Sequence, residues 1–298
     1  MVSMSAHKAG FISIIGKPNA GKSTLLNALL GEKISIITPK VQTTRHRIMG
    51  ILSKSDYQLV FSDTPGIIKP KYRLHGSMMD FVNQSLQDAD VVLFIADVQE
   101  RIDEELLQKL LLIKTPLLVL LNKIDLLGSN VEVLQKVEEW RGILPHAAGI
   151  VPVSALNKFN IDELIKAILP LVPEGPSYYP EDQLTDKSER FVAAEIIREK
   201  IMMRYKEEIP YATQVEIESF KEEEKIIRIS AVIYVMRDSQ KQIMIGKGGS
   251  ALKNVGIAAR RDLEKFFNKQ IFLQTFVKVK EDWRDNDRLL KEFGYKEE

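Results

Sequence analysis

Short apolar and β-branched runs alternate with longer stretches of helical periodicity over residues 9–169. The runs that predict strands are residues 11–15, 57–62, 91–96, 117–121 and 150–153. The stretches that predict helices are residues 22–30, 73–87, 103–113, 131–142 and 161–169. Strands separated by helices are typical of βαβ crossovers over a mainly parallel sheet that is buried on both faces. The pattern therefore predicts an α/β domain whose ligand lies at the carboxyl ends of the strands.

A different pattern begins where four prolines recur every three or four residues, at positions 170, 173, 176 and 180. This spacing disfavours helix and sheet, so it predicts a semi-rigid linker. Beyond it, a helix, two strands, a helix and a strand are expected at residues 186–205, 215–220, 227–235, 250–268 and 271–279. That order, αββαβ, predicts a smaller α+β domain. We therefore divide the chain into residues 8–170, a linker at 171–184 and a second domain at 185–298.

Composition limits the classes of protein that remain. The 298 residues exceed the size of a usual single core, which agrees with two domains. Hydrophobic residues make up 45% and charged residues 28%, as in an ordinary globular protein. The absence of cysteine excludes disulfides, thiol catalysis and cysteine-ligated zinc, and the four scattered histidines form no metal cluster in the sequence.

Targeting signals are not evident in the sequence. Residues 1–8 lack the apolar core of a signal peptide. The longest apolar runs, such as residues 117–121, are far below the roughly 20 residues that a membrane span needs. We therefore expect a cytoplasmic protein without a transmembrane segment.

Charge is unevenly distributed along the chain, although the formal net charge is only +1. Residues 237–280 contain ten Lys or Arg side chains against three Asp or Glu side chains. A basic segment in an otherwise neutral chain indicates a polyanionic partner for one region only. A solvated helix face is the alternative interpretation of the same charges.

The segment GKPNAGKS lies between the first predicted strand and the first predicted helix. Its glycines let backbone N–H groups turn toward an anion, at the positive end of the helix dipole. Lys22 can reach the β- and γ-phosphates, and the Ser23 hydroxyl can reach a magnesium ion. The alternative is a Gly-rich turn that only caps a helix. The predicted phosphate site is Gly16, Lys17, Pro18, Asn19, Ala20, Gly21, Lys22 and Ser23.

Two further motifs place metal-binding and phosphate-binding groups near this loop. Asp63-Thr64-Pro65-Gly66 follows a predicted strand, so the Asp63 carboxylate can hold magnesium through a water and Gly66 can offer its N–H to a γ-phosphate. Thr43-Thr44 lies in a polar segment that can fold over the nucleotide. Each motif alone is more often a turn or a cap.

The last two motifs suit a guanine base. Asn122-Lys123-Ile124-Asp125 follows a strand, and the Asp125 carboxylate can accept from both guanine N1–H and the exocyclic amine, a pair that adenine does not present. Ser154-Ala155-Leu156 follows the next strand and can offer a backbone N–H to the guanine O6. Five motifs in this order, each near a strand end, predict a GTP site. The order disfavours the alternative that the motifs are turns and caps without a common ligand.

The set GKPNAGKS, TTR, DTPG, NKID and SAL resembles that of the translation-factor-related GTPases. The resemblance implies binding of GTP and its hydrolysis to GDP and phosphate, with Thr44 and Asp63 in segments that respond to the γ-phosphate. It places Ser23, Thr44 and Asp63 at magnesium, with Thr43 as the alternative to Thr44. It also implies that Thr64, Pro65 and Ile67 line the GTP site.

Position 67 raises a question about hydrolysis. Ras-type switches place a water-orienting glutamine after the glycine of this motif, whereas here the residue is Ile67, which has no donor or acceptor. We therefore assign catalysis to Lys22, Asn19 and Thr44. Related GTPases with asparagine at the position of Asn19 use it to hold K⁺ beside the phosphates; the alternative is that Asn19 only favours the turn. A nucleotide-gated RNA scaffold with negligible hydrolysis is the alternative function.

The predicted RNA site lies in the basic segment. Gly246-Lys247-Gly248-Gly249 opens a helix, its glycines let a backbone phosphate approach, and Lys247 neutralises that phosphate, as in KH-type RNA-binding modules. A simple helix-entry turn is the alternative. The residues that we assign to RNA are Ile245, Gly246, Lys247, Gly248, Gly249, Lys253 and Arg260.

The combination of a P-loop GTPase domain with a C-terminal KH domain, together with the tail VKVKEDWRDNDRLLKEFGY over residues 277–295, resembles the ribosome-assembly GTPases of bacteria. This resemblance covers essentially the whole chain. It implies binding to the single-stranded 3′ end of 16S ribosomal RNA, a role in 16S processing and assembly of the 30S subunit, and peripheral membrane association. A GTPase of transfer-RNA modification would need a different appended domain.

Overall fold

The computed structural model describes residues 7–101 and 104–296. Contacts between Cα atoms divide these residues into two compact units. The first unit holds the described residues up to Ser35, together with Thr44–Lys69 and Met78–Asp186. The second holds Ile36–Thr43, Pro70–Ser77 and the described residues from Lys187 onward.

A six-stranded sheet forms the centre of the first unit, in the order β2-β3-β1-β4-β5-β6. Neighbouring strands are parallel, except that β2 and β3 are antiparallel. The mainly parallel sheet predicted from the sequence is therefore confirmed. The strands are β1 Lys8–Ile15, β2 Ile48–Ser53, β3 Tyr57–Asp63, β4 Val91–Asp97, β5 Leu117–Asn122 and β6 Gly149–Val153.

Strand β2 is the element of this sheet that the sequence pattern did not predict. Its residues, IMGILS, contain a glycine and show no regular alternation. Gly50 is needed for packing, since a Cβ there would lie 2.6 Å from the Cδ1 atoms of Leu26 and Leu30. The strand forms because its backbone pairs with β3, a contact that the local pattern does not encode.

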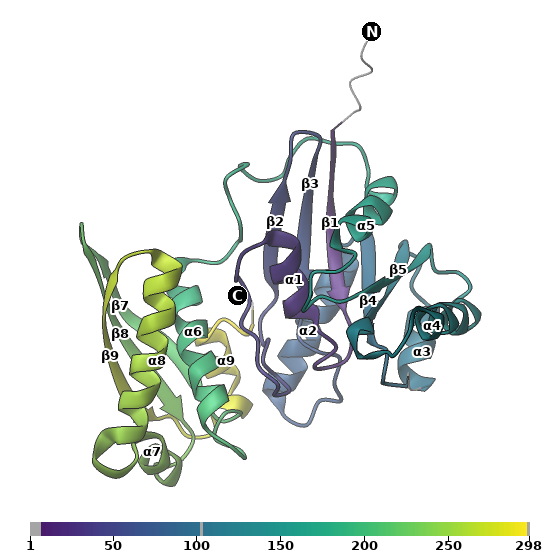
Figure 1. The fold of residues 1–298 in the computed structure, drawn as a ribbon. Coiled ribbons are helices and arrows are strands. Elements are labelled where there is room, and N and C mark those ends of the chain that lie inside the picture. The colour runs from purple at the N-terminus through teal and green to yellow at the C-terminus, as the bar shows by residue number, and fades with distance from the viewer. Residues whose placement is uncertain (1–6, 102–103, 297–298) are drawn as a thin grey trace. The chain divides into compact units, whose positions relative to one another are not determined.

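Helices connect the parallel strands of the first unit, whereas β2 is followed directly by β3 (Figure 1). In β4 all seven residues are buried, and successive side chains point to opposite faces, so the sheet is covered on both sides. Phe94 packs with Leu106 of α3 and Trp140 of α4 in one buried cluster. The helices are α1 Lys22–Leu30, α2 Arg73–Gln87, α3 Glu104–Leu111, α4 Asn130–Ile143 and α5 Ile161–Ile168, and the 103 start expected for α3 lies outside the described residues.

A three-stranded sheet in the order β7-β8-β9 forms the second unit, with β7 and β8 antiparallel and β8 and β9 parallel. Helices α6 and α8 lie side by side over this sheet (Figure 1). Ile197 of α6 and Val255 of α8 pack with Ile233 of β8 in its core. The elements are α6 Glu189–Arg204, β7 Gln214–Glu222, β8 Ile226–Val235, α7 Asp238–Ile245, α8 Ser250–Phe267, β9 Gln270–Val279 and α9 Asp287–Glu292.

Helix α7 corrects the predicted αββαβ order of the smaller domain. The observed order is αββααβ, followed by α9. The helix spans only eight residues and buries only Met244, so it is too short to show a helical period in the sequence. A hydrogen bond from a distant part of the chain stabilises this helix: the Tyr205 hydroxyl donates to the Met244 carbonyl at 2.6 Å.

The proline-containing stretch predicted as a linker packs along the first unit. The buried Gln58 side chain accepts from the backbone N–H groups of Tyr178 and Tyr179 at 2.7 and 2.9 Å. Ile51 N donates to Leu184 O at 2.9 Å. Contacts between Cα atoms therefore place this stretch, up to Asp186, in the first unit. The domain limits that we derived from the sequence, with a linker at residues 171–184, stay a prediction.

Within the second unit, the short segment Ile36–Thr43 is held by α6. The Arg198 guanidinium is buried, donates from Nε to Glu195 Oε1 at 2.7 Å and also donates from Nη2 to the Thr43 carbonyl. The Lys40 ammonium donates to the Tyr205 carbonyl at 2.6 Å. Separately, none of the helices in the described part of the chain combines the length and the apolar character needed to cross a bilayer.

Candidate functional site

The phosphate loop joins β1 to α1, and its glycines are required by the atoms around them. A Cβ on Gly16 would lie 2.4 Å from the Ile95 carbonyl oxygen, and one on Gly21 would lie 2.2 Å from Asn122 Nδ2. Gly21 also has φ 106°, which side chains rarely adopt. Asn19 has φ 62°, a left-handed conformation that asparagine tolerates, so the turn interpretation of Asn19 stays open beside the potassium one.

Lys22 lies inside this loop with 6% of its surface exposed. Its ammonium donates to the carbonyls of Gly16 and Lys17 at 3.2 and 2.8 Å. Burial lowers the pKa of Lys22 to about 8, against the opposing effect of the Asp63 and Glu100 carboxylates. A cation in so poorly solvated a place is attracted strongly to an arriving phosphate.

Three side-chain oxygens converge next to the loop. Ser23 Oγ donates to Asp63 Oδ2 at 2.7 Å and lies 2.8 Å from Thr44 Oγ1, which itself lies 3.4 Å from Asp63 Oδ2. Burial raises the pKa of Asp63, and the hydrogen bond from Ser23 and the charge of Lys22 only partly offset it. Asp63 Oδ1 is buried without a hydrogen-bond partner among the described residues. Hydroxyl and carboxylate oxygens with one unpaired carboxylate oxygen fit a hard cation such as Mg²⁺.

The two threonines of the TTR motif point to different partners. Thr44 Oγ1 faces Ser23 and Asp63, as described above. Thr43 Oγ1 instead donates to the Lys40 carbonyl at 2.6 Å and lies 2.6 Å from Thr38 Oγ1. The geometry therefore favours Thr44 over Thr43 as a metal-binding hydroxyl.

The DTPG segment lies against the phosphate loop. A Cβ on Gly66 would lie 2.7 Å from Pro18 N, and Ile67 N donates to Gly16 O at 3.1 Å. Thr64 Oγ1 donates to the Ile14 carbonyl at 2.8 Å. The Ile67 side chain packs against the buried cluster of the first unit. Ile67 thus holds its segment by packing and has no group that orients water, and Pro65 beside it is buried.

The base-binding motifs are tied to the phosphate loop through one buried amide. Asn122 Nδ2 donates to Ala20 O at 2.8 Å, and Asn122 Oδ1 accepts from Ala155 N at 2.9 Å. Ser154 Oγ donates to Asp125 Oδ1 at 2.5 Å, which orients that exposed carboxylate. The structure therefore brings together the five motifs that the sequence placed near separate strand ends, while Ile124 packs against the buried cluster of the first unit.

The GxxG loop connects α7 to α8 in the second unit. Gly246, Gly248 and Gly249 have φ of 73°, 59° and 75°. A Cβ on Gly246 would lie 2.6 Å from Ala251 Cβ, whereas a Cβ on Gly248 or Gly249 would have no neighbour within 4 Å among the described residues. Lys247 is exposed at the tip. The loop is thus an open, preformed bend that presents a lysine.

The other residues assigned to RNA differ in position. Lys253 and Arg260 are exposed on α8, seven residues apart, which places them on one face of the helix. Arg260 Nε lies 3.8 Å from Glu264 Oε1. Ile245 is partly buried and packs against the core of its unit. The exposed lysine and arginine can meet a phosphate backbone, while Ile245 supports the loop from inside.

Comparison with known proteins identifies both units. A family described as 50S ribosome-binding GTPase matches residues 11–123, and a KH domain family matches residues 208–284. A crystal structure of Era in complex with MgGDPNP and nucleotides 1506–1542 of 16S ribosomal RNA is 43% identical, with a TM-score of 0.93, over 97% of this chain and 99% of that chain. The chain belongs to the Era family. An Aquifex aeolicus Era variant bound to GDP and aluminium fluoride is also 43% identical over the same shares, with a TM-score of 0.92.

Membership of the Era family confirms the predicted fold and function. The chain is a GTPase that combines a P-loop domain, with its mainly parallel sheet, and a KH-type RNA-binding domain. Era-family membership supports hydrolysis over the alternative of a scaffold that only binds nucleotide. The individual site residues stay predictions, supported by the contacts described above.

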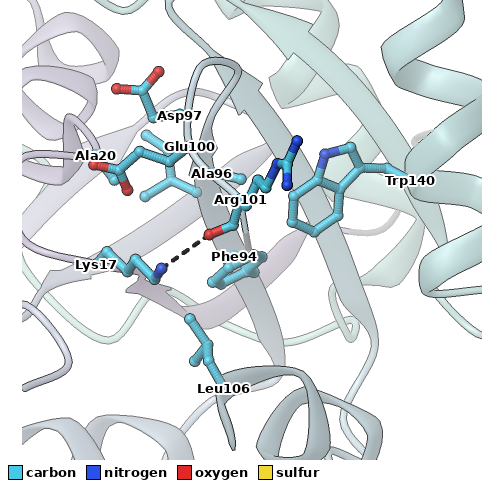
Figure 2. Close-up of a pocket in the computed structure, with 10 residues that line it drawn as sticks. Lys17, Ala20, Phe94, Ala96, Asp97, Glu100, Arg101, Leu106 and Trp140 are labelled. Atoms are coloured by element: carbon cyan, nitrogen blue, oxygen red, sulfur yellow. Dashed lines mark hydrogen bonds between the residues drawn. The ribbon is translucent and has the colours of Figure 1, made fainter. Parts of the chain in front are cut away.

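A small pocket lies beside the phosphate loop (Figure 2). Lys17 and Ala20 line it from the loop, and Phe94, Leu106 and Trp140 supply apolar side chains. The Lys17 ammonium donates to the Arg101 carbonyl at 3.0 Å. The pocket borders the phosphate loop at Lys17 and Ala20, whereas Lys22, Ser23 and Asp63 are not among the residues that line it.

The sequence interpretation missed Asp97, which also lines this pocket. Asp97 ends β4 at the same sheet edge as the base-binding motif and pairs with Lys123, Asp97 Oδ2 lying 2.6 Å from Lys123 Nζ. Its position directly after the predicted strand at 91–96 was the available signal. No sequence motif linked it to Lys123.

Proposed function

We propose that this chain is a GTP-hydrolysing switch that binds the single-stranded 3′ end of 16S ribosomal RNA and acts in assembly of the 30S ribosomal subunit. The observation that carries the proposal is that one chain holds both a guanine-nucleotide site with its metal-binding oxygens in contact and an open GxxG loop with an exposed lysine. Era in the similar structure is bound to MgGDPNP and to a 16S fragment. Cytoplasmic location and peripheral membrane association stay predictions.

Hydrolysis would rest on charge stabilisation. The transition state of phosphoryl transfer is loose and spreads negative charge over the transferred oxygens. Lys22 and the loop N–H groups face that charge, in a site where burial makes the attraction strong. Ser23, Thr44 and Asp63 would hold Mg²⁺, which would supply the remaining positive charge. Asn19 would hold K⁺ as a further charge beside the phosphates.

Guanine specificity would rest on Asp125. Its carboxylate is exposed and oriented by Ser154, and Asn122 ties the base motif to the phosphate loop. An Asp125→Asn change removes the acceptor for guanine N1–H and the exocyclic amine, so it should weaken GTP by several kcal/mol, on the order of a thousandfold, and favour xanthosine triphosphate. Equal affinity of the unmodified protein for GTP and ATP would rule out this assignment.

RNA binding would rest on the GxxG loop and the basic face of α8. The test is filter binding of an RNA with the 1506–1542 sequence of 16S, beside an RNA of the same composition in scrambled order. The natural sequence should bind more tightly, and its affinity should fall steeply between about 50 and 200 mM salt because backbone phosphates are contacted. Equal binding of both RNAs would overturn the 16S assignment, and absence of binding to either would overturn RNA binding at this loop.

A further inference from the structure

Asp97 lies at the edge of the sheet where the base-binding motif begins. It is the last residue of β4, and its partner in the parallel register with β5 is Asn122. Lys123 follows directly after Asn122. Only 8% of Asp97 is exposed, so its carboxylate is largely removed from water. Figure 2 shows it among the residues beside the phosphate loop.

The two carboxylate oxygens of Asp97 have separate partners. Oδ1 accepts from the backbone N–H of Gln99 at 2.9 Å, and Glu100 N donates to the Asp97 carbonyl at 3.0 Å. These bonds close a turn after the strand, which is a common structural use of aspartate. Oδ2 is not needed for that turn. It accepts from the Lys123 ammonium at 2.6 Å.

Lys123 has a defined backbone conformation and a defined position of its ammonium. Its backbone has φ 66°, a left-handed conformation that is uncommon outside glycine. Its ammonium is fixed by Asp97, while one third of the side chain, 33%, remains exposed. A lysine normally loses much rotamer freedom when it is ordered. Here the protein's own Asp97 carboxylate orders the end of the side chain.

We propose that Asp97 is a positioning residue for the guanine nucleotide: its carboxylate holds Lys123 in place between Asn122 and Asp125. The proposal rests on the proposed function, in which this motif binds the base. Asp97 reaches the nucleotide only through Lys123. Asp97 should therefore affect the affinity for GTP and GDP. It should change neither the choice of base nor the rate of the chemical step.

The Asp97→Asn variant separates the two uses of this side chain. The asparagine carbonyl can still accept from Gln99 N and keep the turn, but the charge that holds Lys123 is lost. GTP and GDP should both bind about tenfold more weakly, since one side chain is no longer ordered beforehand. KM should rise with kcat unchanged, and the ratio of GTP to xanthosine triphosphate affinity should stay the same.

A double-mutant cycle with Lys123→Met tests whether Asp97 acts through Lys123. Lys123→Met alone should also weaken GTP and GDP, and adding Asp97→Asn should cause no further loss. Asp97→Asn alone leaves the Lys123 ammonium without its carboxylate partner, whereas the double variant removes both charges of the pair. The double variant therefore provides the test if Asp97→Asn alone fails to fold. Additive losses, a fall in kcat at constant KM, or a changed base preference would overturn the proposal.

Failure of this inference can be told apart from failure of the proposed function. If Asp125→Asn leaves the preference for GTP unchanged, the base site itself is misassigned. If Asp125→Asn switches the preference as expected while Asp97→Asn binds GTP and GDP normally, only the positioning role of Asp97 is refuted. Melting temperatures without nucleotide check that each variant is folded.

Discussion

The glycines of the nucleotide site and those of the RNA loop are required for different reasons. At Gly21 and Gly66, an added Cβ would lie 2.2 and 2.7 Å from atoms of neighbouring segments. At Gly248 and Gly249 it would meet nothing within 4 Å, and only the positive φ calls for glycine. The nucleotide site is thus built by close contact between loops, whereas the RNA loop is built by local backbone conformation and left open.

The lysines of the two sites differ in the same way. Lys22 is buried, bonded to two loop carbonyls and shifted to a pKa of about 8. Lys247 is exposed at the tip of its loop. A buried, prearranged charge suits chemistry on one small ligand, while an exposed charge suits a long polyanion. Changes in the first site should therefore damage structure and function together, and changes in the second should affect only binding.

Among the changes that test this comparison, the largest effect is expected for Gly21→Ala. The new methyl group would overlap Asn122 Nδ2, and alanine is strained at φ 106°. Overpacking and strain together should weaken the binding free energy of GTP by roughly 3 kcal/mol, which is about a hundredfold in affinity. Isothermal titration with GDP and GTP measures it. Gly142→Ala in α4, where an added Cβ meets nothing within 4 Å, is the matched control, and equal binding by both variants would contradict the close-contact account.

A smaller effect, confined to RNA, is expected for Lys247→Glu. Charge reversal at the exposed tip should weaken RNA about tenfold and flatten the salt dependence, because one phosphate contact is lost. GTP turnover without RNA should not change, since the residues that we assign to the nucleotide belong to the first unit and the loop belongs to the second. Lys225→Glu, the same change at an exposed turn of the second unit, is the control. Equal RNA loss in both variants would show a general charge effect instead of a site.

The potassium assignment of Asn19 predicts an effect on turnover alone. If K⁺ supplies missing charge beside the phosphates, GTP hydrolysis should be about tenfold faster in potassium than in sodium salts of equal ionic strength. Asn19→Ala should remove that difference, while Ile67→Ala should change turnover little because Ile67 only packs in the core. Identical rates in the two salts would leave Asn19 as a turn residue, as its φ of 62° allows.

The smallest effect is a pH dependence that arises from Lys22. The pKa of Lys22 is about 8 in the folded protein and 10.5 in the unfolded chain. Between these two pH values the unfolded chain keeps a proton that the folded protein has lost, so the free energy of unfolding rises with pH. Phosphate binding requires the charged form. Affinity for GDP should therefore fall about fourfold from pH 7 to about 8.5, with proton uptake seen by calorimetry in two buffers. A flat profile would mean that Lys22 stays charged when buried.

The sequence alone determined most of the nucleotide site, because each motif is a local arrangement next to a strand end. The phosphate loop, Asp63, Asn122 and the GxxG loop are all placed by short-range pattern and residue chemistry. The βαβ order with its parallel sheet follows from the same alternation. The sequence also marked the basic segment, and the structure shows Lys247 and Lys253 exposed there.

Tertiary structure decided the features that depend on which segments become neighbours. Strand β2 needs its partner β3, and α7 needs contacts such as the one from Tyr205. The choice of Thr44 over Thr43 follows from which hydroxyl faces Asp63. Asp97 meets Lys123 only because the register of β4 and β5 aligns Asp97 with Asn122. The 24 residues between these two positions contain no local pattern that predicts the alignment.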